Sequence, residues 1–236
     1  MSHSAHCLHL DASGRGKGAA ALPNLAAHRL SEGISNISPL LEKSELVILL
    51  AALGGGTGSG AAAEIASRAK DSGSLVISIV GEPFAEQPLR RAISDLALPK
   101  IEQNSDLTIR VSLERLAWQA RYRDSDWKLG SEWIGELIEG LVMTLANVGK
   151  MNLDLMDLKT IVNRPGNATL IVGNGSAENP EQIVKNAKKS PLSEITADGA
   201  KGCLIQVEGG PDMTCLLYTS DAADEGLGVD LGGRRI

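Results

Sequence analysis

Short apolar segments alternate with longer amphipathic segments along the first half of the chain. Residues 46–53 and 75–80 are almost entirely apolar, which predicts strands that are buried on both faces of a sheet. Residues 107–111 predict a third strand. The segments around them have helical periodicity and predict helices over residues 24–43, 61–71 and 87–103, the last broken or bent near Pro99. This order predicts parallel strands joined by right-handed crossovers.

The second half of the chain begins with a strongly predicted helix over residues 131–146, where apolar residues recur at spacings of three and four. Beyond it, residues 168–172 and 203–207 are predicted strands on either side of a helix over residues 180–189. They indicate the start of a second α/β unit. The predicted fold class is therefore α/β, with a parallel-sheet domain at 1–130, a long central helix at 131–148 and a truncated second α/β unit at 149–214.

The last segment, residues 215–236, has neither a helical nor a strand period. Its sequence resembles the conceptual translation of a sequencing-library adapter, read through at the end of a DNA insert. An ordinary polar tail is the alternative. We therefore leave this segment out of the fold argument and expect the natural protein to continue past Thr214.

Composition and charge exclude several classes of function. Apolar residues make up 43% of the chain, enough for a sizeable core, and the net charge of -6 argues against a nucleic-acid-binding protein. No apolar run is long enough to span a membrane, and the first residues do not form a signal peptide. The three cysteines are far apart in sequence, so neither a zinc site nor a disulfide framework is indicated. These features fit a cytoplasmic protein.

A glycine-rich loop, Gly54–Gly60, reads GGGTGSG and separates a predicted strand from a predicted helix. Such a loop suits an anion, because glycines let the backbone approach phosphate closely and the helix dipole favours negative charge. It is not a Walker loop, since no Gly-Lys-Ser/Thr follows. It could also be a tight turn, or part of a dinucleotide fold with GxGxxA at residues 58–63 and an acidic residue, Glu82, after the next strand.

The heptapeptide GGGTGSG is the signature of the tubulin/FtsZ superfamily, and the chain from about Gly14 to Thr214 resembles the FtsZ family of prokaryotic cell-division GTPases. The resemblance implies a Rossmann-like GTPase domain that binds GTP or GDP with Mg²⁺. It implies that backbone contacts near the γ-phosphate come from Gly18, Ala19 and Ala20. It also implies that the phosphates are wrapped by Gly54, Gly55, Gly56, Thr57, Gly58, Ser59 and Gly60.

Further site residues follow from the same resemblance. Glu86 would accept hydrogen bonds from the ribose hydroxyls and Arg90 would approach the phosphates; taken alone, they are equally an i,i+4 surface pair. Glu132 aligns with an acidic residue that reads guanine, and Trp127 falls where an aromatic side chain packs on the base or in the core. Leu113 stands where the family has an asparagine that helps to read the base.

Residues 152–158 read NLDLMDL and resemble the loop that enters the next subunit's nucleotide pocket in the family. The resemblance implies catalysis in trans by Asn152, Asp154 and Asp157, with the two carboxylates orienting a water molecule beside the γ-phosphate. Taken alone, Asp154 is more simply a helix N-cap and Asp157 an acid in the first turn.

The function implied is a GTPase that polymerises head to tail for cell division, at the division site, with membrane-tethering division proteins as partners and no membrane insertion of its own. The family also opens with a strand and another glycine-rich loop, which nothing before Asp11 resembles. We therefore expect this 236-residue chain to bind GTP poorly or not at all. The alternatives are a non-catalytic tubulin-like scaffold or regulator, and a Rossmann NAD-dependent oxidoreductase, which leaves residues 152–157 unexplained.

Overall fold

The computed structural model of the chain describes residues 18–122, 155–162 and 178–188, with further single residues or pairs at 134–135, 138–139, 142, 168 and 176. The chain divides into two compact units. The first comprises Met1–Trp118 and Pro165–Leu170, and the second Gln119–Arg164 and Ile171–Ile236.

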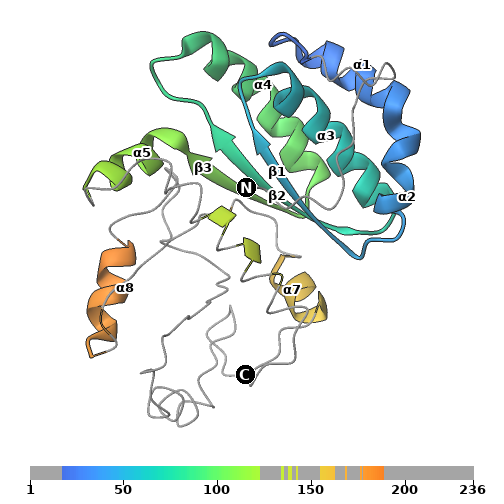
Figure 1. The fold of residues 1–236 in the computed structure, drawn as a ribbon. Helices are drawn as coiled ribbons and strands as arrows, with labels where there is room; N and C mark the ends of the chain where they lie inside the picture. The colour runs from blue at the N-terminus through green and yellow to red at the C-terminus, as the bar shows by residue number, and fades with distance from the viewer. Residues whose placement is uncertain are drawn as a thin grey trace. The chain divides into compact units, whose positions relative to one another are not determined.

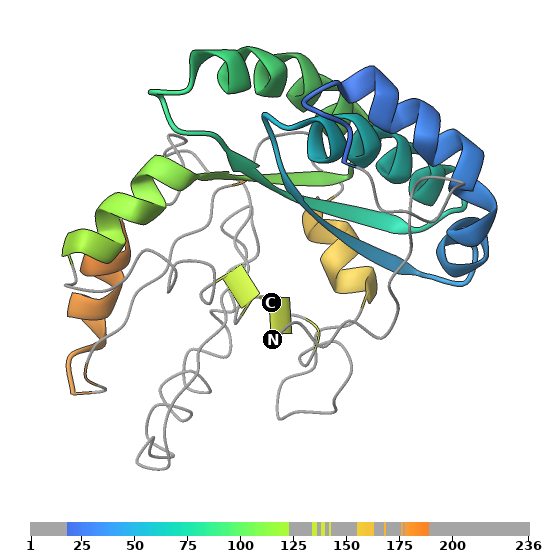
Figure 2. The same ribbon diagram turned by 45° about the horizontal axis from the view of Figure 1, so that its top comes forward.

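The first unit is built on a parallel sheet of three strands, β1 (Leu46–Ala52), β2 (Leu75–Glu82) and β3 (Leu107–Ser112), in the order β1-β2-β3. Two helices connect them, α3 (Gly56–Asp71) between β1 and β2, and α4 (Pro88–Asn104) between β2 and β3. Figures 1 and 2 show both helices on one face of the sheet, with α1 (Pro23–Gly33) beside α3. The predicted parallel α/β fold is confirmed.

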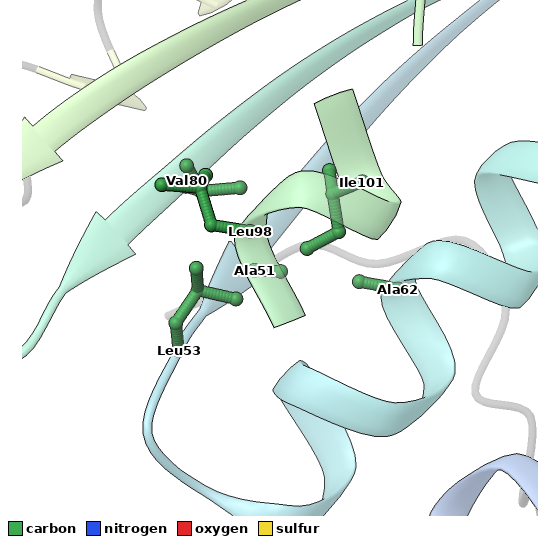
Figure 3. Packing of buried hydrophobic residues seen from close by; sticks show 6 residues of the cluster. All are labelled: Ala51, Leu53, Ala62, Val80, Leu98 and Ile101. Carbon is green, nitrogen blue, oxygen red and sulfur yellow. The ribbon is translucent and has the colours of Figure 1, made fainter. Parts of the chain in front are cut away.

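The core lies between the sheet and the two crossover helices (Figure 3). Val80 of β2 and Ile101 of α4 are fully buried there, and Ala62 is the contribution of α3. A second cluster joins Ala66 and Ala69 of α3 to Val76 of β2. Alanines on the inner face of α3 let that helix approach the sheet closely, while each fully buried branched side chain contributes roughly 1.5–3 kcal/mol.

The helix predicted over residues 24–43 forms three separate pieces instead. These are α1, which ends at Gly33, a 3₁₀ turn at Ile34–Asn36 and a short helix α2 at Ser38–Leu41. Pro39 explains the last break, because its ring would clash with a carbonyl one turn earlier and it has no N–H to continue the hydrogen-bond ladder. It is tolerated at the start of α2, where no N–H partner is needed.

Three other helices differ in part from the sequence-based prediction. Helix α3 begins at Gly56, five residues before the predicted start at residue 61, and so includes most of the glycine loop. Helix α4 is assigned as a single helix that contains Pro99. Helix α5 (Leu113–Tyr122), which directly follows β3, was not predicted. Glycine is a poor helix former, so the sequence alone places the start of α3 too late.

The second unit contains α7 (Leu155–Val162), whose Leu158 and Val162 are buried, and α8 (Pro180–Lys188), which agrees with the helix predicted at 180–189. The described residues between 134 and 142 are helical, as the prediction for 131–146 requires. Of the strand predicted at 168–172, only Ala168 is described, and it belongs to the first unit. It forms a parallel bridge with Ile109, and its N–H donates to the Thr108 carbonyl at 3.2 Å. The strand predicted at 203–207 lies outside the described residues.

Candidate functional site at the carboxyl edge of the sheet

The carboxyl ends of β1 and β2 open into two loops at the same edge of the sheet. Residues 53–55 lead from β1 into α3, and residues 83–87 lead from β2 into α4. The two strand ends are tied together, since the Leu53 N–H donates to the Gly81 carbonyl at 2.9 Å. Ligands of open α/β sheets bind outside this edge, where the loops present backbone groups.

The glycine loop is fixed from within by one buried hydrogen bond. Gly54 has a φ of +87°, a left-handed conformation that glycine adopts without strain, and its N–H donates to the Ser59 hydroxyl at 2.9 Å. Ser59 is buried, so its hydroxyl shapes the loop from inside. Because α3 starts at Gly56, the amides of its first turn have no partner within the helix, and they and the helix dipole favour an anion.

Close packing explains most of the glycines in this loop. A Cβ atom on Gly58 would lie 2.1 Å from the Ala52 carbonyl oxygen, and one on Gly60 would lie 2.0 Å from the Pro23 carbonyl oxygen. Gly55 differs, since nothing lies within 4 Å of its Cβ position. The loop therefore packs on β1 and α1 through Gly58 and Gly60, and it is open at Gly55. The neighbouring Thr57 side chain is exposed.

The segment before α1 packs directly on this loop. A Cβ atom on Gly56 would lie 2.8 Å from the Ala19 Cβ, and Ala19 is buried. Ala20 and Ala21 have φ values of 46° and 58°, in the left-handed region that alanine rarely adopts. The Gly18 carbonyl accepts a hydrogen bond from Arg29 Nη1 at 3.0 Å. The turn at 18–21 is thus held against α3 at considerable local cost.

The loop after β2 reaches the glycine loop from the other side. This segment encloses Gly54. A Cβ atom added to Gly54 would lie 2.8 Å from the Arg90 Cβ and 3.2 Å from the Pro83 Cγ. Pro83 is buried, whereas the side chains of Glu86 and Arg90 are exposed. Within the described part of the chain, neither of these two side chains forms an ion pair or hydrogen bond.

Three segments proposed from the sequence to hold the nucleotide therefore come together: Gly18–Ala20, Gly54–Gly60 and the Glu86–Arg90 segment. Leu113 is the first residue of α5, and its Cδ2 atom lies 3.8 Å from the position that a Cβ atom on Gly81 would take. Asp157 is the third residue of α7, and only its backbone is described. The remaining candidates lie outside the described residues: Trp127, Glu132, Asn152 and Asp154.

One feature of this edge was missed by the sequence analysis. Arg110 of β3 donates from Nε to Glu82 Oε1 at 2.8 Å, and its Nη2 binds the same oxygen. The signal in the sequence was a cation within the strand sequence LTIRVS. Under the dinucleotide interpretation Glu82 would accept from a ribose, but here its carboxylate is engaged by Arg110.

None of the helices in the described ranges is long and apolar enough to cross a membrane. In the same ranges, no group of three or more His, Cys, Asp or Glu side chains is arranged to hold a metal ion.

Similarity to known families covers most of the chain. Residues 2–119 match the family described as Tubulin/FtsZ family, GTPase domain, and residues 166–225 match the FtsZ family, C-terminal domain. The chain is 34% identical over 204 residues to cell division protein FtsZ 1 of Archaeoglobus fulgidus, and 35% identical over 205 residues to cell division protein FtsZ of Haloferax mediterranei. Both alignments cover 85% of this chain, but only 55% and 54% of those relatives.

The fold is also similar to solved structures. The empty FtsZ dimer of M. jannaschii superposes with a TM-score of 0.78 at 28% identity, covering 93% of this chain and 65% of that one. CetZ from Methanosaeta thermophila shares the fold, with a TM-score of 0.65 at 18% identity. The chain spans about half the length of the curated relatives it matches. With the glycine loop and the parallel sheet in the expected order, these matches show that the chain belongs to the Tubulin/FtsZ family and carries sequence of its GTPase domain and of the FtsZ C-terminal domain.

Proposed function

We propose that the protein carrying this chain binds and hydrolyses GTP and polymerises head to tail into filaments for cell division. The observation that supports this most is the meeting of three loop segments at the carboxyl edge of the sheet. They combine the open Cβ position of Gly55, the first turn of α3 and the exposed side chain of Arg90. Together these groups suit a chain of phosphates.

The residues present fit a nucleoside triphosphate. The glycine loop has open space at the Cβ position of Gly55. Its backbone N–H groups and the N-terminus of α3 would bind an anion there. Mg²⁺ would be held mainly by phosphate oxygens and water, as is usual for this ion, and would neutralise charge on the phosphates. We propose Glu86 for the ribose, and Trp127 and Glu132 for the base.

We further propose that hydrolysis is completed by a neighbouring subunit. Asn152, Asp154 and Asp157 would enter its nucleotide pocket, where the carboxylates orient the attacking water. A contact between two different surfaces of identical subunits generates a filament if it does not close into a ring. The similar FtsZ of M. jannaschii has been solved as a dimer, which supports self-association. Membrane-tethering division proteins would bring the filament to the division site from the cytoplasm.

The nucleotide site is tested by placing a charge where the loop is open. Gly55→Asp introduces a carboxylate at a position with no atom within 4 Å, so the fold should tolerate it while phosphate is repelled. We expect the complete protein, recovered by sequencing the gene beyond both ends of this chain, to lose measurable GTP binding on this substitution.

Gln103→Glu is the matched control, because it adds the same charge on the exposed far end of α4. It should bind GTP like the parent protein. Equal GTP affinity of Gly55→Asp and the parent, with both folded by circular dichroism, would contradict a nucleotide site at this loop.

A further inference from the structure

The ion pair between Glu82 and Arg110 lies where β2 ends and the candidate site begins. Glu82 is the last residue of β2, and both Nε and Nη2 of Arg110 bind its Oε1 atom. In the register of the sheet, Arg110 is opposite Val80, so the pair runs diagonally across the two strands. The Glu82 side chain is only 16% exposed and that of Arg110 30% exposed. Partial burial strengthens such a charge-assisted contact.

The segment that follows Glu82 touches the glycine loop at both of its ends. Pro83 comes next and contacts Gly54, and the chain returns to Gly54 at Arg90, whose carbonyl oxygen lies 2.9 Å from the Cβ position of that glycine. A turn closes the segment, since the Gln87 N–H donates to the Phe84 carbonyl at 3.1 Å. The direction in which the chain leaves β2 therefore sets where this segment meets the glycine loop.

We infer that the Glu82–Arg110 pair is a positioning element that fixes the 83–90 segment against the glycine loop and so sets the affinity of the site for a nucleotide. This inference rests on the proposed function. Without the Glu82 carboxylate, Arg110 would be a partly buried guanidinium with no counter-charge, and it would turn toward water. The end of β2 would then lose its tie to β3, so Pro83 could shift, and with it the segment that carries the exposed side chains of Glu86 and Arg90.

A matched pair elsewhere in the same unit separates positioning from general stabilisation. Arg68 and Glu64 on α3 have the same two residue types and the same contact pattern, with Nε and Nη2 at 3.0 and 2.9 Å from one carboxylate oxygen. This pair is more exposed and lies within a single helix. Glu64→Gln therefore removes an ion pair of the same two residue types without changing any residue at the end of β2.

The binding experiment compares Glu82→Gln with Glu64→Gln in the complete protein. We expect GTP affinity to fall about tenfold in Glu82→Gln, with little change in Glu64→Gln, whose ion pair is exposed. The reversed pair Glu82→Arg/Arg110→Glu should recover part of the lost affinity. Equal affinity of Glu82→Gln and Glu64→Gln would overturn the inference while leaving GTP binding by the parent protein intact.

A second readout needs no nucleotide. Amide hydrogen exchange in residues 84–90 should be faster in Glu82→Gln than in the parent chain, and unchanged in Glu64→Gln. If the complete protein binds no GTP at all, the proposed function fails and this exchange experiment alone decides the positioning role. Unchanged exchange in Glu82→Gln would then overturn it.

Discussion

Close contacts with neighbouring segments, as well as the proposed phosphate binding, require glycine at several positions of the glycine loop. Gly58 and Gly60 each lie where an added Cβ would meet a backbone carbonyl oxygen at close to 2 Å, from Ala52 and Pro23 respectively. Backbone atoms cannot rotate away as a side chain can, so either substitution must displace a strand or a helix. Gly55, three residues before Gly58, has open space instead.

We expect Gly58→Ala to lower the free energy of unfolding by roughly 1–3 kcal/mol, because the Ala52 carbonyl must shift to admit the methyl group. Gly55→Ala adds the same atoms without a contact, and should change stability by less than about 0.5 kcal/mol. Urea unfolding of the two variants provides the comparison. Similar midpoints for both would show that the loop is looser than its contacts indicate.

The turn before α1 makes a prediction of the opposite sign. Ala20 has a φ of 46°, which costs an alanine roughly 1–2 kcal/mol. Ala20→Gly should therefore raise the free energy of unfolding by up to about 1 kcal/mol, after the greater freedom of glycine in the unfolded chain is subtracted. Ala27→Gly, within α1, should instead lower it by about 1 kcal/mol. A loss of stability in Ala20→Gly would be inconsistent with strain at this turn.

At the scale of elements, α4 tolerates a proline that helices normally exclude. Pro99 lies within Pro88–Asn104 and its side chain is exposed, so it brings no packing contact to offset the missing N–H. Pro99→Ala should increase stability, by up to about 3 kcal/mol. Pro39→Ala is the control, since Pro39 lies at the start of α2 where proline costs little. Thermal unfolding of both variants tests the difference.

Strands were easier to predict than helix ends. The apolar runs at 46–53 and 75–80 set the strands to within two residues. The burial predicted with them is confirmed for β2 but is wrong for β1, where Ala51 is buried and Leu50 is 59% exposed. The start of α3 was missed because the low helix propensity of glycine predicts a loop at Gly56, whereas the helix begins at that residue. Helix α5 was missed because it follows β3 without an intervening turn residue.

At the scale of the whole molecule, the proposed function is tested by asking which subunit supplies the carboxylates that we propose for catalysis. Gly55→Asp should lack nucleotide but keep residues 152–157, whereas Asp154→Ala should bind nucleotide but not hydrolyse it. If catalysis is in trans, an equal mixture of the two complete proteins should regain up to about a quarter of the parent turnover, since one contact in four pairs the intact halves. Phosphate release by each protein alone and by the mixture measures this.

Catalysis within a single subunit would leave that mixture as inactive as its components. A mixture with no turnover, while both proteins co-sediment in filaments, would therefore rule out the trans scheme.

The family could be recognised from the sequence because its loop motif is specific, and the matches over residues 2–119 and 166–225 agree with it. The coming together of Gly54, Ala19 and Arg90 could be expected only through that resemblance, since the three are distant in sequence and no periodicity links them. The Glu82–Arg110 pair could not be foreseen, because the register that joins β2 to β3 is a property of the folded sheet.

The tight enclosure of the glycine loop also bears on how quickly a ligand can be captured. Gly54, Gly56, Gly58 and Gly60 are each held by a neighbouring segment, so the loop has little conformational freedom left to lose when a ligand arrives. Association should then proceed without a slow closing step and be governed by diffusion and charge. The side chain of Arg90, which is exposed and unpaired within the described chain, is the part that still has to be ordered.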